Sequence, residues 1–294
     1  MKKIFFVIII TIISILGKTQ ANNIQPEILY GTVQKADLER SPYSEWFNTG
    51  YCNYQPSQEI IEKLKKQITN DTRIEVFFGT WCGDSRRELP RLLKILDEIS
   101  FPTKNLQLIG VGGSDSLIKQ SPGHEEEGKG IFRVPTIIVY QKGKETKRIN
   151  EYPCWSLEND LYAILSHQSY EPSYKSFALI KKWMDDGSLL NKNISARSFA
   201  SQLRALTEGE YELNSLAHLL LKQGKMREAL KLFQVNYNLY PESARVVSSL
   251  GEGYFKTGDT VNAVISLEKA LELNKDPKII KEILVLLYEA KGVK

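Results

Sequence analysis

A single cysteine stands where a predicted strand passes into a predicted helix. Residues 73–78 (RIEVFF) are β-branched and aromatic, which is typical of a buried strand, and residues 85–99 have the apolar spacing of an amphipathic helix. Cys82 therefore lies in the turn at the N-terminus of that helix. The positive end of the helix dipole, the unpaired backbone N–H groups and the nearby Arg86 and Arg87 all favour thiolate over thiol. We therefore expect Cys82 to be a nucleophile.

The residues around this cysteine resemble the active-site turn of the thioredoxin family. That turn usually has a tryptophan, a cysteine, two variable residues and a second cysteine, and the matching residues here are Trp81, Cys82, Gly83, Asp84 and Ser85. The resemblance implies that Cys82 attacks protein disulfides and that Trp81 forms a lid beside it. Because Ser85 stands in place of the second cysteine, Cys82 can form a mixed disulfide but needs an external thiol to release it.

Two further positions carry the same resemblance. Pro90 stands where thioredoxins have a proline that kinks the active-site helix, and residues 130–136 (GIFRVPT) are similar to the segment that ends in the family's cis-proline. The resemblance makes Pro135 that cis-proline. It also implies a peptide-binding contact, formed by Val134, Pro135 and Thr136.

The other elements of residues 22–170 predict an α/β domain with the thioredoxin-like fold. We expect strands at 28–33, 73–78, 106–111, 136–141 and 145–149, and helices at 57–68, 85–99 and 156–166. The last two strands resemble the family's final β-hairpin. Strands and helices that alternate and end in an antiparallel pair predict a mixed sheet with helices on both faces.

A change of pattern near residue 173 predicts a second, all-helical part. At a spacing of 34 residues, similar residues coincide: Leu213 with Val247, Ala217 with Gly251, and Ala229 with Ala263. This resembles the tetratricopeptide repeat (TPR), in which small residues let paired helices approach. The resemblance gives two repeats, at 210–243 and 244–277, with a capping helix at 278–290. Residues 171–209 are expected to form a degenerate helical pair.

The N-terminus has the order of a secretory signal peptide. Lys2 and Lys3 precede an apolar run at 4–16, which is too short to span a membrane, and the small residues up to Ala21 predict cleavage there. We therefore expect residues 1–21 to be removed and the protein to be exported, to a periplasm or outside the cell. An uncleaved anchor is the alternative.

The composition excludes some partners. The hydrophobic fraction of 42% and the charged fraction of 25% are those of an ordinary soluble protein. Without residues 1–21 the chain has 36 basic and 35 acidic residues, so it offers no electrostatic reason to expect nucleic acid or an anionic membrane. We expect no metal or other cofactor, because His124, beside three glutamates, has no second histidine at ligand spacing.

Three cysteines in an exported chain leave the disulfide pairing open. Cys154 follows the predicted hairpin, and in thioredoxin-like folds the loop there passes close to the active-site turn, which makes Cys154 the candidate for a displaced second thiol. A structural bridge from Cys52 to Cys154 and a state with all thiols free are the alternatives.

These patterns give two hypotheses for function. In the first, Cys82 exchanges disulfides with proteins or peptides, and the repeats select the partner. In the second, the protein is a redox-inactive scaffold in which both parts only bind other proteins. The residues beside the thiol, Gly83, Asp84, Ser85 and Arg86, belong to the site in the first hypothesis.

Overall fold

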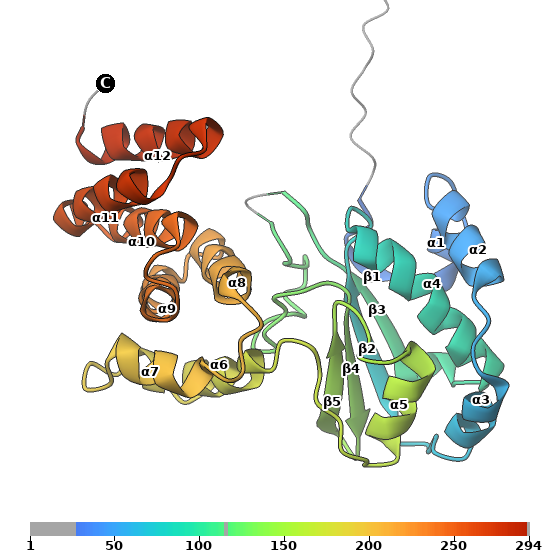
Figure 1. Cartoon of the computed structure of the whole chain (residues 1–294). Helices are drawn as coiled ribbons and strands as arrows, with labels where there is room; N and C mark the ends of the chain where they lie inside the picture. Colours follow the sequence, from blue (N-terminus) through green and yellow to red (C-terminus); the bar gives the residue numbers. More distant parts are fainter. Residues whose placement is uncertain (1–27, 115–116, 293–294) are drawn as a thin grey trace, which may run out of the picture.

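The computed structural model describes residues 28–114 and 117–292, and the predicted signal peptide lies outside them. The described residues form a five-stranded sheet with helices, followed by an array of helices (Figure 1). The sequence predicted this order of an α/β part and an all-helical part. Within the described ranges, no helix is long and apolar enough to cross a membrane.

The sheet has the strand order β1-β3-β2-β4-β5. Its strands are β1 (Gly31–Val33), β2 (Arg73–Phe78), β3 (Leu106–Gly110), β4 (Thr136–Gln141) and β5 (Lys144–Asn150). The central strand β2 runs parallel to β3 and antiparallel to β4, while β1 and β5 pair antiparallel at the two edges. The predicted mixed sheet is confirmed, although β1 begins three residues later than predicted.

One face of the sheet is covered by helices. These are α1 (Lys35–Leu38), α2 (Ser44–Asn53), α3 (Gln58–Lys65), α4 (Gly83–Glu98) and α5 (Leu157–Leu165). They pack on the inward-facing residues of the strands, such as Val76 and Phe78 of β2. The helices α1 and α2 were not predicted. The sequence of α2 contains glycine and two asparagines, which are weak helix formers, and its Gly50 packs so tightly on Pro90 of α4 that an added Cβ would lie 2.7 Å from the ring.

The other face is not covered by helices in the described residues, so that part of the prediction is wrong. Successive residues of a strand point to opposite faces, and Glu75 and Phe77 of β2 point to this second face. The segment between β3 and β4 crosses it as turns and buries Ile131 and Val134 there. This segment is rich in glycine and charge and has no periodic apolar stripe, which a helix needs in order to pack on a sheet.

The second part consists of antiparallel helices. They are α6 (Ser176–Asp185), α7 (Ala196–Leu203), α8 (Glu210–Lys222), α9 (Met226–Leu239), α10 (Ala244–Lys256), α11 (Thr260–Leu273) and α12 (Pro277–Ala290). The starts of α8 and α10 are 34 residues apart, as are those of α9 and α11, which confirms the predicted repeat of helical hairpins. Gly251 permits close approach, because a Cβ there would lie 2.7 Å from Leu267.

The segment between β3 and β4 also packs against both parts of the molecule. It lies between the sheet and the helical array, with α6 and α8 nearest to it (Figure 1). Phe132 of this segment stacks on Phe177 of α6, with 4.0 Å between ring centroids, and belongs to the apolar core of the array. The positive φ of Gly130 and its contact with Phe177 leave no room for a side chain. The array is therefore held against the segment that leads into Pro135.

Candidate active site

Cys82 lies where the sequence predicted it, at the end of a turn between β2 and α4. It is the residue that precedes the first helical residue, Gly83, so α4 begins two residues earlier than predicted. The Cys82 N–H donates to Gly79 O at 2.9 Å, which closes the turn after the central strand. Pro90 lies inside α4. The thiol is thus held at the positive end of a 16-residue helix and is partly exposed.

The thiol contacts the residue that precedes the predicted cis-proline. The Cys82 Sγ donates to Val134 O at 3.2 Å, and the peptide bond between Val134 and Pro135 is cis. The Thr136 hydroxyl donates to Arg133 O at 2.6 Å and fixes the loop as β4 begins. The structure therefore brings Cys82 into contact with Val134, one of the three residues predicted to contact a peptide. Loss of the thiol proton would break the bond to Val134 and free the sulfur to turn outward.

The ring of Trp81 is fixed beside the thiol. Its indole N–H donates to Val111 O at 3.0 Å. Gly79 and Gly113 lie against the ring, and a Cβ at either position would come within 2.5 and 2.7 Å of it, respectively. Trp81 nonetheless keeps part of its surface exposed.

The two arginines of the turn differ in their partners. Arg87 contacts the carboxylates of Asp84 at 2.7 Å and Glu88 at 2.6 Å, so its charge is compensated. Arg86 donates from Nε to Thr80 O at 2.5 Å, and among the described residues it forms no ion pair. The pairing of Arg87 with two carboxylates therefore argues against its action on the thiol, and the action of Arg86 stays a prediction.

Ser85 cannot serve as a second redox group. Its side chain is fully buried, and its Oγ accepts a hydrogen bond from the Gly79 N–H at 3.2 Å. Val76 is buried in the core on the helical face. Within the described part of the chain, Cys82 is thus a thiol with no second cysteine in its turn.

A basic residue that the sequence analysis missed lies close to the thiol. Lys119 belongs to the segment between β3 and β4, where its N–H donates to Gly112 O at 2.9 Å. Burial lowers the pKa of Lys119, and the charge of Arg133 lowers it further, while the acidic groups of Cys82 and Glu151 act in the opposite direction. These groups therefore lie within electrostatic reach of one another. No local pattern could reveal this, because residues 112–129 have the composition of a solvated loop.

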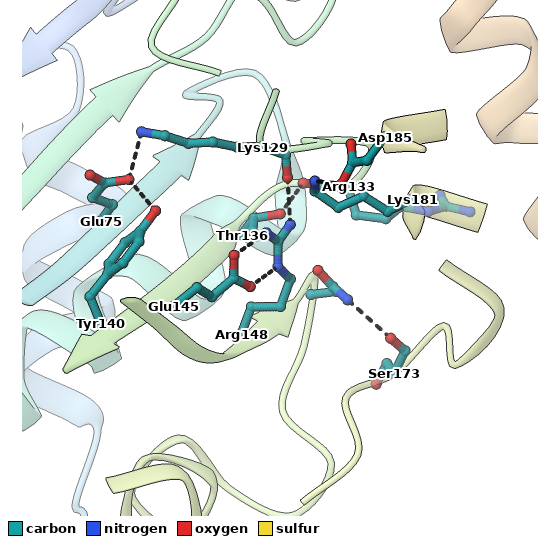
Figure 2. A network of polar contacts seen from close by, with 11 residues as sticks. Glu75, Lys129, Arg133, Thr136, Tyr140, Glu145, Arg148, Ser173, Lys181 and Asp185 are labelled. Atoms are coloured by element: carbon teal, nitrogen blue, oxygen red, sulfur yellow. Dashed lines mark hydrogen bonds and ion pairs between the residues drawn. The ribbon is translucent and has the colours of Figure 1, made fainter. Parts of the chain in front are cut away.

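A polar network on the second face of the sheet holds the approach to Val134 in place (Figure 2). Glu75 accepts from Lys129 Nζ at 2.7 Å and from the Tyr140 hydroxyl at 2.9 Å. Burial and this contact raise the pKa of Tyr140, so its hydroxyl stays protonated and donates. Arg148 donates to both oxygens of Glu145 and, at 2.8 Å, to the carbonyl of Lys129. Hydrogen bonds therefore hold both the side chain and the backbone carbonyl of Lys129, which lies four residues before Arg133 in the segment that leads to Val134.

The other two cysteines are free thiols in this structure, as is Cys82. Cys52 is exposed on α2. The Sγ of Cys154 lies 3.2 Å from Glu171 O and 3.8 Å from Ser173 Oγ, so it contacts the linker that leads to α6. A role for Cys154 as a second thiol stays a prediction.

The described residues contain no group of three or more His, Cys, Asp or Glu side chains that could hold a metal ion. His124 contacts Glu126 at 3.6 Å on the segment between β3 and β4. In comparisons with known proteins, neither a family model nor a curated protein matches this chain.

Proposed function

We propose that the protein exchanges disulfides with other proteins through Cys82, acting as a monothiol. The observation that carries this proposal is the position of Cys82, at the N-terminus of α4 and 3.2 Å from the carbonyl that precedes Pro135. Arg86 lies in the first turn of α4, and Lys119 lies within electrostatic reach of Cys82. The proposal includes a thioredoxin-like fold for the sheet part and TPR-type repeats for the helical array.

The reaction would proceed in two exchanges. The Cys82 thiol gives its proton to water, and the thiolate attacks one sulfur of a substrate disulfide. The substrate S–S bond breaks, its second sulfur leaves as a thiolate with the bonding electrons, and a new S–S bond joins Cys82 to the substrate. An external thiol then attacks this mixed disulfide and releases Cys82. Because no cysteine occupies position 85, the active-site turn itself offers no thiol to release the mixed disulfide.

The surroundings of the thiol support a peptide as the substrate. The Val134 N–H forms no hydrogen bond with any described residue, so it can pair with the backbone of a bound chain. The helical array is fixed to the same loop through Phe132 and Phe177. A partner held by the array would therefore be presented to Cys82, and we assign partner selection to the array, in an exported protein.

The test is to trap the mixed disulfide. Protein isolated under acid quench from its own compartment should carry partner proteins on Cys82, and a reductant should release them. Cys82→Ala should carry none. Cys52→Ser and Cys154→Ser are the matched controls, and both should still trap the same partners.

One result would contradict the proposal. If Cys82→Ala binds the same partners without a covalent bond, and the parent protein forms no adduct, the thiol is idle. The protein would then be a redox-inactive scaffold that uses both parts for binding alone.

A further inference from the structure

A groove of about 670 Å³ opens beside the Cys82 turn, on the side of α2. Its volume lies in the range of sites that hold a ligand, roughly 300–1,000 Å³. The walls come from the segment before β1, from α2 and the loop before it, from the turn after β2 and from the start of α4. Aromatic and apolar side chains dominate the lining, among them Ile28, Tyr43, Trp46 and Trp81.

A buried hydroxyl in this lining has no hydrogen-bond partner among the described residues. The Thr80 side chain is 3% exposed, and its Oγ1 forms no hydrogen bond with any described residue. A buried hydroxyl without a partner costs stability, on the order of 1–3 kcal/mol. Thr80 lines the groove, but its Oγ1 is shielded from solvent, so a bound molecule could reach this hydroxyl only after a rotation of the side chain.

Arg86, whose guanidinium has no carboxylate partner among the described residues, lines the same groove. Arg86 uses Nε for Thr80 O and keeps its two terminal nitrogens for other acceptors. Two other arginines of α4, Arg87 and Arg91, both contact Glu88, and neither lines the groove. Arg86 is therefore placed to bind a carboxylate from outside the described chain.

The charge of the groove limits what it can hold. Glu45 also lines it and, in the described part of the chain, forms no ion pair. A polyanion would be repelled by Glu45, whereas one carboxylate can bind at Arg86. The remaining wall is aromatic and favours an apolar side chain.

We propose that this groove is a specificity site for the polypeptide that exchanges disulfides with Cys82, binding an aromatic or large aliphatic side chain against Trp46 and Trp81 and a substrate carboxylate at Arg86. The inference rests on the proposed function. Trp81 lines the groove and precedes Cys82 in the chain, with Cα atoms about 3.8 Å apart, so the groove lies beside the turn that carries the thiol. The preferred substrate therefore carries an aromatic residue and an acidic residue within a few positions of its reactive cysteine.

The test uses the full chain with Cys52→Ser and Cys154→Ser, which leaves Cys82 as its one thiol. Synthetic peptides carry a cysteine joined to thionitrobenzoate, with phenylalanine and glutamate beside it on one side or the other. Cys82 attacks the peptide sulfur, and thionitrobenzoate leaves because it is the more acidic thiol. Its absorbance gives the rate constant. Matched peptides replace glutamate by glutamine or lysine, or phenylalanine by alanine.

The readout is the ratio of rate constants between two peptides, which cancels any change in the reactivity of Cys82 itself. We expect the parent to prefer the glutamate peptide over the glutamine peptide by roughly threefold to tenfold at low salt. Arg86→Gln should bring this ratio to about one, and Arg86→Glu should reverse it in favour of the lysine peptide. Lys94→Gln, which removes the same charge from α4 outside the groove, should keep the parent ratio.

Three results would overturn the inference. Exchange without a preference for glutamate or phenylalanine, or a glutamate preference that persists in Arg86→Gln, would remove the groove from substrate selection while leaving the proposed function intact. Absence of exchange with every peptide would overturn the proposed function, and the groove site with it. A reversed preference in Arg86→Glu cannot arise from misfolding, so it supports the site directly.

Discussion

Restoring a second cysteine with Ser85→Cys should create a reversible disulfide with Cys82. Cys82 precedes the first residue of α4, and Ser85 is the third residue of that helix. Side chains at these two positions approach each other, as they do in a capping box. Both residues also form hydrogen bonds with Gly79, through the Cys82 N–H and the Ser85 Oγ. The turn is therefore already folded around the place where the bridge would form.

The size of the effect follows from two opposing changes. Closing a loop of about four residues stabilises the folded state by about 2 kcal/mol through the entropy of the unfolded chain. Replacing the Ser85 Oγ by sulfur weakens the bond that the buried Gly79 N–H donates at 3.2 Å, which costs about 1 kcal/mol. The reduced variant should thus be about 1 kcal/mol less stable than the parent. The oxidised variant should be about 1 kcal/mol more stable.

The assay is urea unfolding of the oxidised and reduced forms, in a background with Cys52→Ser and Cys154→Ser, together with thiol titration. Ser85→Ala is the control, because it loses the same hydrogen bond and cannot form a bridge. Reduction of insulin with dithiothreitol should also rise well above the parent. If the oxidised variant keeps two free thiols, or both forms unfold at the same urea concentration, the turn lacks the geometry that we infer.

Three further predictions concern single residues. Gly130→Ala should lower the free energy of unfolding by about 2–4 kcal/mol, because a Cβ would lie 2.6 Å from Phe177 at a positive φ. The control Gly128→Ala, with a positive φ and no neighbour within 4 Å, should lower it by about 1 kcal/mol. Equal losses in urea unfolding would show that the Phe177 contact does not restrain this loop. Thr80→Val should leave the free energy of unfolding unchanged or raise it by up to about 1 kcal/mol, since the hydroxyl it removes has no described partner, and a clear loss would refute this. Burial lowers the pKa of His218, so its neutral form stabilises the fold above about pH 6.5, and this contribution is lost as the pH falls through the lowered pKa. The free energies of unfolding of the parent and of His218→Gln should therefore converge on acidification. A difference that stays constant with pH would contradict this prediction.

The sequence alone determined the elements whose signal is local. The strand before Cys82, the turn and the start of α4 follow from a short run of β-branched residues and a helical period that begins next to the cysteine. The cis bond at Pro135 and the 34-residue repeat of helical hairpins were also predicted from short motifs. The strand, the turn and the helix depend on residues near one another in the chain, so composition and spacing predict them, whereas the cis bond was expected from the resemblance of residues 130–136 to the thioredoxin family.

Tertiary structure alone decided what surrounds the thiol. The neutralisation of Arg87, the proximity of Lys119 and the anchoring of Lys129 by Glu75 depend on which segments pack together. The same holds for α2, whose weak helical propensity is overridden by packing on α4. Periodicity reports which residues are buried but not against what they are buried. The partners of a buried or charged group are fixed by contacts between segments distant in the chain, and a local pattern carries no record of those contacts.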